Sequence, residues 1–491
     1  MGKLFTFIII LITAASCVTR NKANNTLQTT YSKEQVSNDL QLLEKVLMAN
    51  HPGLHVFISQ QELEVLKDSI IQQLPAMASI HQARNAVATY VAAIGCGHTS
   101  VRYSKAMMRA GGKATPSKQF PLGVKVWGDS AVVLFNLWGR ADTAITQGTI
   151  LTHINGIRVD SLLHQMRTVV STDGSSLSFK DQFISNSFGS LYKTFYPNDT
   201  SLSVRFIAAD GQMQDKYIPY YKAPKNVSNA VPTVRIPTPK PSPWVKQNAS
   251  LLFQPATETA ILSIHSFEGN KGLRRFIKKA FEEIEKRGTK NLIIDLRRNT
   301  GGRISLATLL TKYVANTSFH VADSVYTSSK KIALKQYVKP HFAYGLHKWL
   351  FTKKISDSVF TVPYFANKKY HPTTQHHFDG NIYYLTGGYT FSAATLHLHF
   401  VHKQPNVTLI GEETGGNYYA LNAVHIPDIE LPNTLLRVRL PLYRQVFDSS
   451  RTFTSKGFLP TYQVLPSSEA IKRGIDAKMQ KAFDIIKATA Q

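Results

Sequence analysis

The sequence predicts an α/β protein with a helical N-terminal region, a small strand-rich module and a C-terminal core built on a parallel sheet. Apolar runs at 260–264 and 291–296 are typical of buried strands, and amphipathic helical segments follow them. This alternation predicts parallel strands with crossover helices. Glycine pairs, Gly301-Gly302 and Gly387-Gly388, follow two of the strands. They lie at the carboxyl ends of the predicted parallel strands, where ligands bind in such sheets.

The first residues predict export from the cytoplasm. Lys3 precedes an apolar run over 4–12, and small residues then lead directly into Cys17. This pattern is typical of a secretory signal and is too short for a membrane span. Because it resembles a bacterial lipoprotein signal, we expect a signal peptide over 1–17 and lipidation of Cys17. The expected location is the cell envelope, periplasmic or at the outer membrane. An ordinary signal peptide with a chance cysteine is the alternative.

Composition indicates a globular protein with anionic partners. Of 491 residues, 43% are hydrophobic and 18% charged, and 57 Lys and Arg against 31 Asp and Glu give a net charge of +26. Such a charge favours membrane surfaces, nucleic acid or acidic peptides. The chain shows no nucleic-acid-binding motif, so we expect a membrane surface and no nucleic acid. Cys96 is the single other cysteine, so no intramolecular disulfide is expected.

The chain divides into predicted regions. Residues 18–110 follow the signal as a helical region, whose third helix, over 82–94, runs into Gly97-His98-Thr99. Short strands with one short helix predict a small module over 115–222. Its strand–Asn155-Gly156–strand segment resembles a PDZ-like domain, which would bind a peptide C-terminus by strand addition. Six prolines mark a linker over 223–250.

The remaining region, 251–491, carries the parallel-sheet core. After the two strands and their helices, 273–287 and 304–313, we expect the following elements: a strand at 382–385, a helix at 393–401, a strand at 407–411, a strand pair over 435–447 and a closing helix over 467–488. An insertion over 328–370 contains nine lysines and one acid, Asp357, with interleaved aromatic residues. This texture fits a lid or a surface that rests on membrane or cell-wall polymer. A solvated insertion is an equal alternative.

Ser392 stands at the turn between the strand at 382–385 and the helix at 393–401. The preceding glycines permit a sharp turn, because glycine tolerates positive φ. A serine at such a junction exposes its hydroxyl close to the Ala393 amide and the positive end of the helix. A serine nucleophile needs this arrangement of an accessible oxygen and a donor for the oxyanion. The alternative is a serine that only caps the helix.

Three motifs carry a family resemblance: N-L-I-I-D-L-R-R-N-T-G-G at 291–302, T-G-G-Y-T-F-S-A-A at 386–394 and I-G-E-E-T-G-G at 410–416. Their order and spacing resemble the S41 serine peptidases, the family of the C-terminal processing peptidases and their tricorn-like members. The resemblance implies a crotonase-like or ClpP-like catalytic core, a polypeptide substrate and no cofactor. It implies Ser392 as nucleophile and an oxyanion hole from the amides of Ala393 and Gly301 or Gly302. Asp295 and Arg297 would brace the loop.

The general base departs from one branch of the family. That branch uses a lysine where this sequence has Asn417, which cannot take a proton. The tricorn-like branch takes a histidine from the N-terminal region, and Gly97-His98-Thr99 resembles its motif. We therefore expect His98 as the base. A triad also needs an acid to orient the imidazole. Three candidates remain open: Glu413, Asp448 and Asp476.

These observations predict a secreted serine endopeptidase that cleaves envelope or unfolded polypeptides. The oligomeric state stays open. The histidines at 397, 399 and 402 lack a zinc-peptidase motif, so no metal is expected. Cys96 is expected to be a buried structural thiol. Two alternatives remain. One is a catalytically decayed protein of this fold that binds hydrophobic ligands or peptides. The other is an envelope scaffold that uses the basic insertion.

Overall fold

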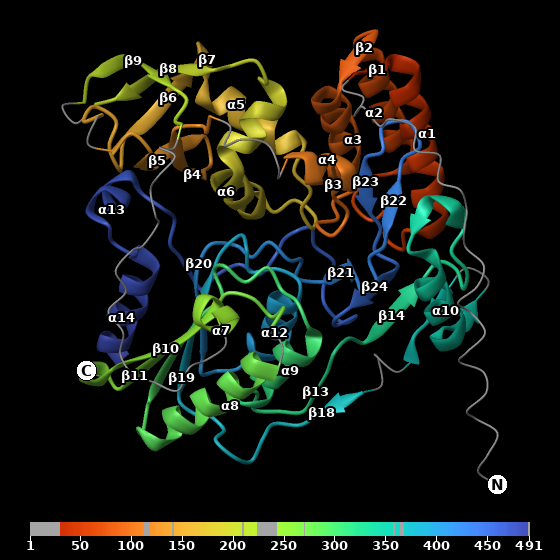
Figure 1. Ribbon diagram of the computed structural model, residues 1–491. Coiled ribbons are helices and arrows are strands. Elements are labelled where there is room, and N and C mark those ends of the chain that lie inside the picture. Colours follow the sequence, from red (N-terminus) through yellow and green to blue (C-terminus); the bar gives the residue numbers. More distant parts are fainter. Residues whose placement is uncertain are drawn as a thin grey trace.

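The structure is a computed structural model that describes residues 30–111, 118–139, 142–208, 211–222, 243–269, 271–356, 359–363 and 368–489 (Figure 1). The predicted signal peptide, Cys17 and the linker residues 223–242 lie outside the described residues. Among the described residues, we find no helix with both the length and the apolar character needed to cross a bilayer.

A six-stranded sheet forms the C-terminal core, in the order β10-β11-β12-β19-β20-β25. Strand β10 is antiparallel to β11, and the other neighbouring strands are parallel. The predicted α/β architecture is therefore confirmed. The strands are β10 (Ala249–Gln254), β11 (Thr259–Ile264), β12 (Asn291–Asp295), β19 (Asn381–Thr386), β20 (Val407–Gly411) and β25 (Tyr462–Gln463). The helices are α7 (Pro243–Asn248), α8 (Lys271–Lys286), α9 (Ile304–Lys312), α12 (Ala393–Val401), α13 (Ser468–Arg473) and α14 (Ala477–Thr489).

Alternate residues of the central strands face two different layers. Leu292 and Ile294 of β12 pack with α8, α9 and α12 in one core, whereas Ile293 packs against α14 in another. Figure 1 shows α14 on the flank of the sheet away from α8 and α9. Because successive strand residues point to opposite faces, both faces of β12 must be apolar, as its sequence is.

The N-terminal helices begin at serines that satisfy their first backbone amides. Ser32, Ser59 and Ser79 each form a capping box with a Gln or Glu three residues on. The elements of this region are β1 (Thr30–Ser32), α1 (Lys33–Asn50), α2 (Gln60–Gln73), β2 (Met77–Ser79), α3 (Ile80–Ala93), β3 (Val101–Arg102) and α4 (Lys105–Gly111). The helices share one hydrophobic core with buried residues between 322 and 443. The N-terminal helices therefore fold together with part of the C-terminal half, which the sequence patterns did not indicate.

The region after residue 118 contains an antiparallel sheet in the order β4-β5-β6-β8-β9, with β7 paired to β6. The predicted turn is confirmed, since Asn155 and Gly156 both have positive φ (49° and 77°) between β6 and β7. The expectation of one short helix is wrong, because α5 and the 19-residue α6 are both present. The elements are β4 (Leu122–Trp127), β5 (Ser130–Asn136), β6 (Ile150–Ile154), β7 (Ile157–Arg158), α5 (Val159–Thr168), α6 (Leu177–Phe195), β8 (Ser201–Ile207) and β9 (Met213–Pro219). The PDZ resemblance stays a prediction.

Three further expectations need correction. The linker expected over 223–250 does not include 243–250, because α7 begins at Pro243, where a first helical turn tolerates proline, and β10 begins at Ala249. The single closing helix is two helices, α13 and α14, because Gly474 is left-handed (φ 66°). The strands over 435–447 do not pair with each other. They are β23 and β24, and each joins a different sheet.

The described residues of the Lys-rich insertion form strands and a helix. Strands β15, β16 and β17 join strands outside the insertion in two sheets, β16-β17-β14-β24-β21 and β15-β22-β23-β3, while β18 pairs with β13. The second sheet includes β3 from the N-terminal region. These elements are β13 (Phe319–His320), β14 (Ser324–Thr327), β15 (Val338–Lys339), α10 (His341–Phe351), β16 (Lys353–Ser356), β17 (Val359–Thr361), β18 (Lys369–Tyr370), β21 (Ala420–Ala423), β22 (Asp428–Glu430), β23 (Arg437–Arg439) and β24 (Tyr443–Val446).

Candidate active site

Ser392 occupies a strained turn between β19 and α12. Its φ and ψ are 56° and −119°, a region that non-glycine residues rarely adopt. Although Ser392 holds the N-cap position, its side chain makes no capping hydrogen bond. The hydroxyl is therefore left for another partner, and the geometry does not support the interpretation of a simple cap.

Buried hydrogen bonds hold this turn against the neighbouring strand loop. The Thr390 hydroxyl donates to the Leu296 carbonyl at 3.0 Å, and the Phe391 amide donates to the Asn299 carbonyl at 3.1 Å. The Asn299 side chain is fully buried and donates to the Ile264 carbonyl at 2.9 Å. The sequence motif contained Asn299, but its anchoring role was not predicted.

Gly301 and Gly302 allow the loop after β12 to approach Ser392. Both have positive φ, 98° and 132°. A Cβ atom on Gly301 would lie 2.6 Å from the Ser392 Cβ and 2.9 Å from the Ala393 nitrogen. Glycine is required here because any side chain would collide with the serine turn.

The amides of this site are not equally free. The Gly301 amide donates to Asn299 Oδ1 at 2.9 Å. In contrast, the amides of Gly302 and Ala393 have no hydrogen-bond partner among the described residues. Ala393 is the first residue of α12, where backbone amides lack helical acceptors. Two unoccupied donors thus line the same cavity as Ser392.

His98 lies against Ser392 despite a separation of 294 positions in the chain. The distance between His98 Nε2 and Ser392 Oγ is 3.0 Å. The imidazole packs against Phe391, with ring centroids 4.7 Å apart and the rings tilted by 30°. A Cβ on Gly97 would lie 2.7 Å from Phe391 Cζ. The absence of a side chain at Gly97 therefore allows the Phe391 ring to lie close to the backbone before His98.

The environment of His98 favours its neutral form. The side chain is 7% exposed, and Nδ1 is buried without a hydrogen-bond partner among the described residues. Burial and, to a lesser degree, the positive charge of Arg439 lower the pKa of His98 to about 3. At neutral pH the imidazole is therefore uncharged and its Nε2 can accept the serine proton.

Asp173 supports the His98 loop and was missed at the sequence level. Its Oδ1 accepts a hydrogen bond from the Gly97 amide at 2.8 Å, while the Gly174 amide donates to the Gly95 carbonyl at 2.9 Å. Asp173 is 3% exposed, and burial raises its pKa to about 7. Asp173-Gly174 in the sequence signals only a turn, because its contact with the loop is formed in the tertiary fold.

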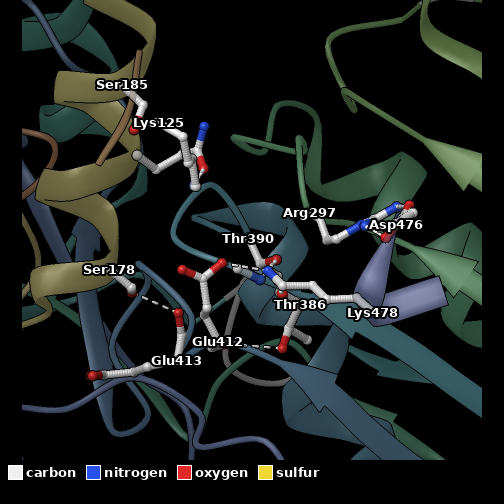
Figure 2. Close-up of polar contacts among 12 residues, drawn as sticks. Lys125, Ser178, Ser185, Arg297, Thr386, Thr390, Glu412, Glu413, Asp476 and Lys478 are labelled. Atoms are coloured by element: carbon white, nitrogen blue, oxygen red, sulfur yellow. Dashed lines mark hydrogen bonds and ion pairs between the residues drawn. The ribbon is translucent and has the colours of Figure 1, made fainter. Parts of the chain in front are cut away.

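None of the three expected orienting acids has a hydrogen bond to His98 among the described contacts. Glu413 Oε1 accepts from the Gly457 amide at 2.8 Å, and Asp448 pairs with Arg451 at 3.0 Å. Asp476 pairs with Arg297 at 2.6 Å, and Arg297 also binds Asp295. Figure 2 shows Glu413 beside Ser178 and the pair of Arg297 with Asp476. These acids therefore stabilise loops, and Asp295 and Arg297 form the expected brace.

A second ionic contact lies beside Gly387, in the turn that leads to Ser392. Lys478 pairs with Glu412 and donates to the Thr386 carbonyl at 3.1 Å, and the Thr386 hydroxyl donates to the Glu412 carbonyl at 2.9 Å (Figure 2). Through Thr386, this contact anchors α14 to the end of β19. It belongs to the scaffold behind the serine turn.

The other sequence candidates have structural partners. Asn417, in the position of the family lysine, donates to the carbonyls of Thr454 and Lys456 at 2.8 and 3.0 Å. Cys96 is fully buried, and burial raises the pKa of its thiol to about 11. The histidines of α12 bind neighbours: His397 contacts Thr311 and Tyr384, His399 contacts Arg451, and His402 contacts Tyr418. In the described part of the chain, no group of three His, Cys, Asp or Glu side chains is placed to hold a metal ion.

A cavity of about 690 Å³ opens onto Ser392 and His98. Its apolar lining includes Phe179, Phe183 and Val170, and Gly302 also lines it. The cavity is large enough for several side chains of a peptide.

Comparison with known proteins identifies the C-terminal domain. Residues 258–464 match the sequence model of peptidase family S41. This part of the chain belongs to peptidase family S41. The family resemblance inferred from the three motifs is therefore confirmed, and the chain is a peptidase by family. No protein of curated function matches the sequence.

Solved structures extend the likeness beyond the matched domain. Mature CPAF complexed with lactacystin aligns with a TM-score of 0.64 and 13% identity, over 94% of this chain and 98% of that chain. Mature CPAF aligns with a TM-score of 0.63 and 12% identity, over 94% and 97%. The photosystem II D1 C-terminal processing protease aligns with a TM-score of 0.39 and 13% identity, over 91% and 98%. At these identities the CPAF likeness shows a shared fold across nearly the whole chain.

Proposed function

We propose that this protein is a serine endopeptidase in which Ser392 is the nucleophile and His98 the general base. The single observation that carries the proposal is the 3.0 Å distance between His98 Nε2 and Ser392 Oγ. Hydrogen-bond contact between a nucleophile and its base is the geometry that nucleophilic catalysis requires. The S41 family match over 258–464 supplies the reaction class.

The reaction follows from these positions. Ser392 Oγ attacks the peptide carbonyl while His98 Nε2 takes the serine proton. The amides of Ala393 and Gly302 stabilise the oxyanion, since the Gly301 amide is already bound to Asn299. His98 then gives its proton to the leaving amine. Water, activated by the same imidazole, hydrolyses the acyl-enzyme.

The base has an unusual electrostatic setting. To accept from serine at Nε2, a neutral His98 carries its proton on Nδ1, and this atom has no partner among the described residues. An acid at that position would stabilise the imidazolium. Without one, the imidazolium gains its stabilisation from the oxyanion that forms next to it.

The test is turnover of an unfolded model protein by the soluble chain that begins at Asn21. We expect cleavage by the parent protein and loss of cleavage in both Ser392→Ala and His98→Ala. If Ser392→Ala abolished cleavage but His98→Ala did not, the protein would still be a serine peptidase, but His98 would not be its base. Cleavage by Ser392→Ala at the parent rate would overturn the proposal.

A decayed binding protein of the same fold is the second candidate. The observation that favours it is the unpartnered Nδ1 of His98, together with the apolar cavity. A fluorophosphonate that labels serine nucleophiles distinguishes the two functions. Rapid labelling that disappears in Ser392→Ala counts against the binding protein. Retention of a hydrophobic peptide without labelling or cleavage supports it.

We also propose a location at the envelope membrane, through a signal peptide over 1–17 and a lipid on Cys17. The exposed face of α10 supports a membrane contact. Phe342, Leu346 and Trp349, at i, i+4 and i+7, are 76%, 46% and 57% exposed. Exposed lysines flank this helix in the sequence, at 331, 335, 339, 353 and 354. Apolar and basic residues together fit the surface of an anionic bilayer.

Vesicle sedimentation tests the membrane contact of α10 in the chain without its lipid. We expect binding to vesicles that contain phosphatidylglycerol and loss of binding on Phe342→Ser with Trp349→Ser. The control is Leu252→Ser, which alters an apolar residue that is 60% exposed elsewhere. Equal binding by all three proteins would remove α10 from the account.

A further inference from the structure

The cavity at Ser392 carries an excess of positive charge. Three arginines line it, Arg84, Arg102 and Arg439, against one acid, Glu268. Glu268 is exposed and forms no ion pair with these arginines among the described residues. Most of the other lining residues are apolar or small, so the arginines are the principal charged groups that a bound peptide meets.

Arg439 reaches this cavity from the end of β23. Its amide donates to the Ser100 carbonyl at 3.0 Å, which fixes it beside the segment that follows His98. Asp428 lies opposite Arg439 in the strand register, yet its carboxylate pairs with Arg437 at 2.7 Å. Arg439 therefore has no ion-pair partner within the described part of the chain.

Arg102 and Arg84 also have no ion-pair partner among the described residues. Arg102, in β3, is exposed and forms no ion pair with a described residue. Arg84, in α3, is half-buried, and its guanidinium donates to the amide oxygen of Asn85 at 2.9 Å. Burial and the nearby charge of Arg102 lower the pKa of Arg439. Asp428 and Glu268 oppose this effect on Arg439 to a lesser degree. Burial also lowers the pKa of Arg84. Arg84 and Arg439 are thus partly desolvated and Arg102 repels Arg439, so a bound anion would relieve both costs.

We propose that Arg84, Arg102 and Arg439 form a subsite that binds a carboxylate of the peptide substrate beside the scissile bond. This inference rests on the proposed peptidase function and names its substrate class. In an unmodified peptide, carboxylates are the side chains of Asp and Glu and the chain terminus. The planar guanidinium of arginine binds them through paired hydrogen bonds.

A bound carboxylate also acts on the chemistry. Arg439 is the charge that, after burial, most disfavours a protonated His98. A substrate carboxylate next to Arg439 offsets this charge and stabilises the imidazolium that forms during attack on the peptide. Acidic substrates are therefore expected to show a higher kcat as well as a lower KM.

The experiment compares matched peptides that differ in one carboxylate. One pair has Glu or Gln near the cleavage site, and a second pair has a free or an amidated C-terminus. Affinity is measured with Ser392→Ala protein, which holds peptides without cleaving them, and kcat/KM is measured with the serine intact. Each is repeated with Arg102→Gln and Arg439→Gln. Arg473→Gln is the control, because it removes an exposed arginine outside the cavity.

We expect the carboxylate peptide to bind about 10- to 100-fold more tightly than its neutral partner, as charge-assisted hydrogen bonds do. Arg102→Gln and Arg439→Gln should each reduce this ratio at least several-fold, and Arg473→Gln should leave it unchanged. The pair that shows the preference identifies the source as a side chain or a terminus. Arg102→Glu should reverse the preference towards basic peptides.

Two failures are distinguishable. Equal affinity for carboxylate and neutral peptides, or a ratio that survives Arg102→Gln and Arg439→Gln, overturns the subsite whatever the parent protein cleaves. Absence of cleavage by the parent, with the binding preference intact, overturns the peptidase function and keeps the subsite as part of a peptide-binding protein.

Discussion

The serine side and the histidine side of the site are built differently. Ser392 and the glycine loop lie at the ends of adjacent strands, β19 and β12, and buried hydrogen bonds join them within one sheet. His98 depends on α3, on Asp173 from the α5–α6 connection and on Phe391 from the serine turn. Local sequence therefore determines the conformation around the nucleophile, whereas packing between distant segments positions the base.

The two sides also differ in charge. Behind the serine turn, Arg297 links Asp295 to Asp476, and Lys478 pairs with Glu412. On the histidine side, Asp173 accepts a hydrogen bond from the loop, but His98 itself has no carboxylate among its described partners. Changes on the serine side should therefore act through geometry, and changes on the histidine side through both geometry and pH.

The largest effect is expected from Gly301→Ala on the serine side. The new Cβ would lie 2.6 Å from the Ser392 Cβ, and the residue would hold a φ of 98°. The loop must move, and the neighbouring Gly302 amide moves with it. We expect kcat/KM to fall by at least about 100-fold, the scale of losing one oxyanion donor.

The matched control is Gly156→Ala, at a φ of 77° with nothing within 4 Å of the added Cβ. It introduces comparable backbone strain without a collision. It should lower thermal stability and leave kcat/KM of the folded protein nearly unchanged. Equal activity losses in Gly301→Ala and Gly156→Ala would show that strain, and not the approach to Ser392, explains the glycine.

An intermediate effect is expected from Asp173 on the histidine side. Asp173→Ala leaves the partly buried Gly97 amide without its acceptor, so the His98 loop should shift and kcat/KM should fall about 10- to 100-fold. Asp173→Asn retains an oxygen for Gly97 and should keep kcat/KM within about threefold. Equal losses in both variants would assign the role to the charge of Asp173.

The same pair of proteins has a pH signature. Burial raises the pKa of Asp173 to about 7, above the value near 3.9 of an unfolded aspartate. Between about pH 4 and 7 the folded protein holds a proton that the unfolded chain has released. Its contribution to the free energy of unfolding therefore decreases by about 1.4 kcal/mol per pH unit as pH rises. His98, whose pKa is lowered, contributes a slope of the opposite sign over part of this window, so the readout is the difference between the two proteins. Chemical denaturation should show that Asp173→Asn removes this one contribution relative to the parent protein.

The smallest effect is expected from the acids that the sequence nominated to orient the base. Glu413→Gln, Asp448→Asn and Asp476→Asn should keep kcat/KM within about threefold, because these side chains bind Gly457, Arg451 and Arg297. A loss approaching the 10⁴-fold seen when a triad acid is neutralised would contradict this assignment. It would show that one of these acids couples to His98.

Sequence patterns predicted the serine side well. The helix expected over 393–401 has those bounds, and both glycine pairs lie at the ends of parallel strands. These features depend on local periodicity and on glycine, which are visible in a single sequence. His98 was reached through a short motif and not through periodicity.

The rest depends on contacts between distant segments. Local sequence patterns do not reveal the core that the N-terminal helices share with residues 322–443. They also do not reveal the hydrogen bond from Gly97 to Asp173. The strand pair expected over 435–447 failed because β23 and β24 pair with other strands. Arg102 and Arg439, which line the cavity, are far apart in the chain and meet only through the pairing of β3 with β23.

A double-mutant cycle on Ser392 and His98 measures whether the two side chains act together in catalysis. Cleavage of one peptide is measured for the parent protein, Ser392→Ala, His98→Ala and the double variant. If the two side chains act as one unit, each single variant should lose about as much kcat/KM as the double variant. Losses that multiply in the double variant would contradict the account, because they would show that Ser392 and His98 act independently.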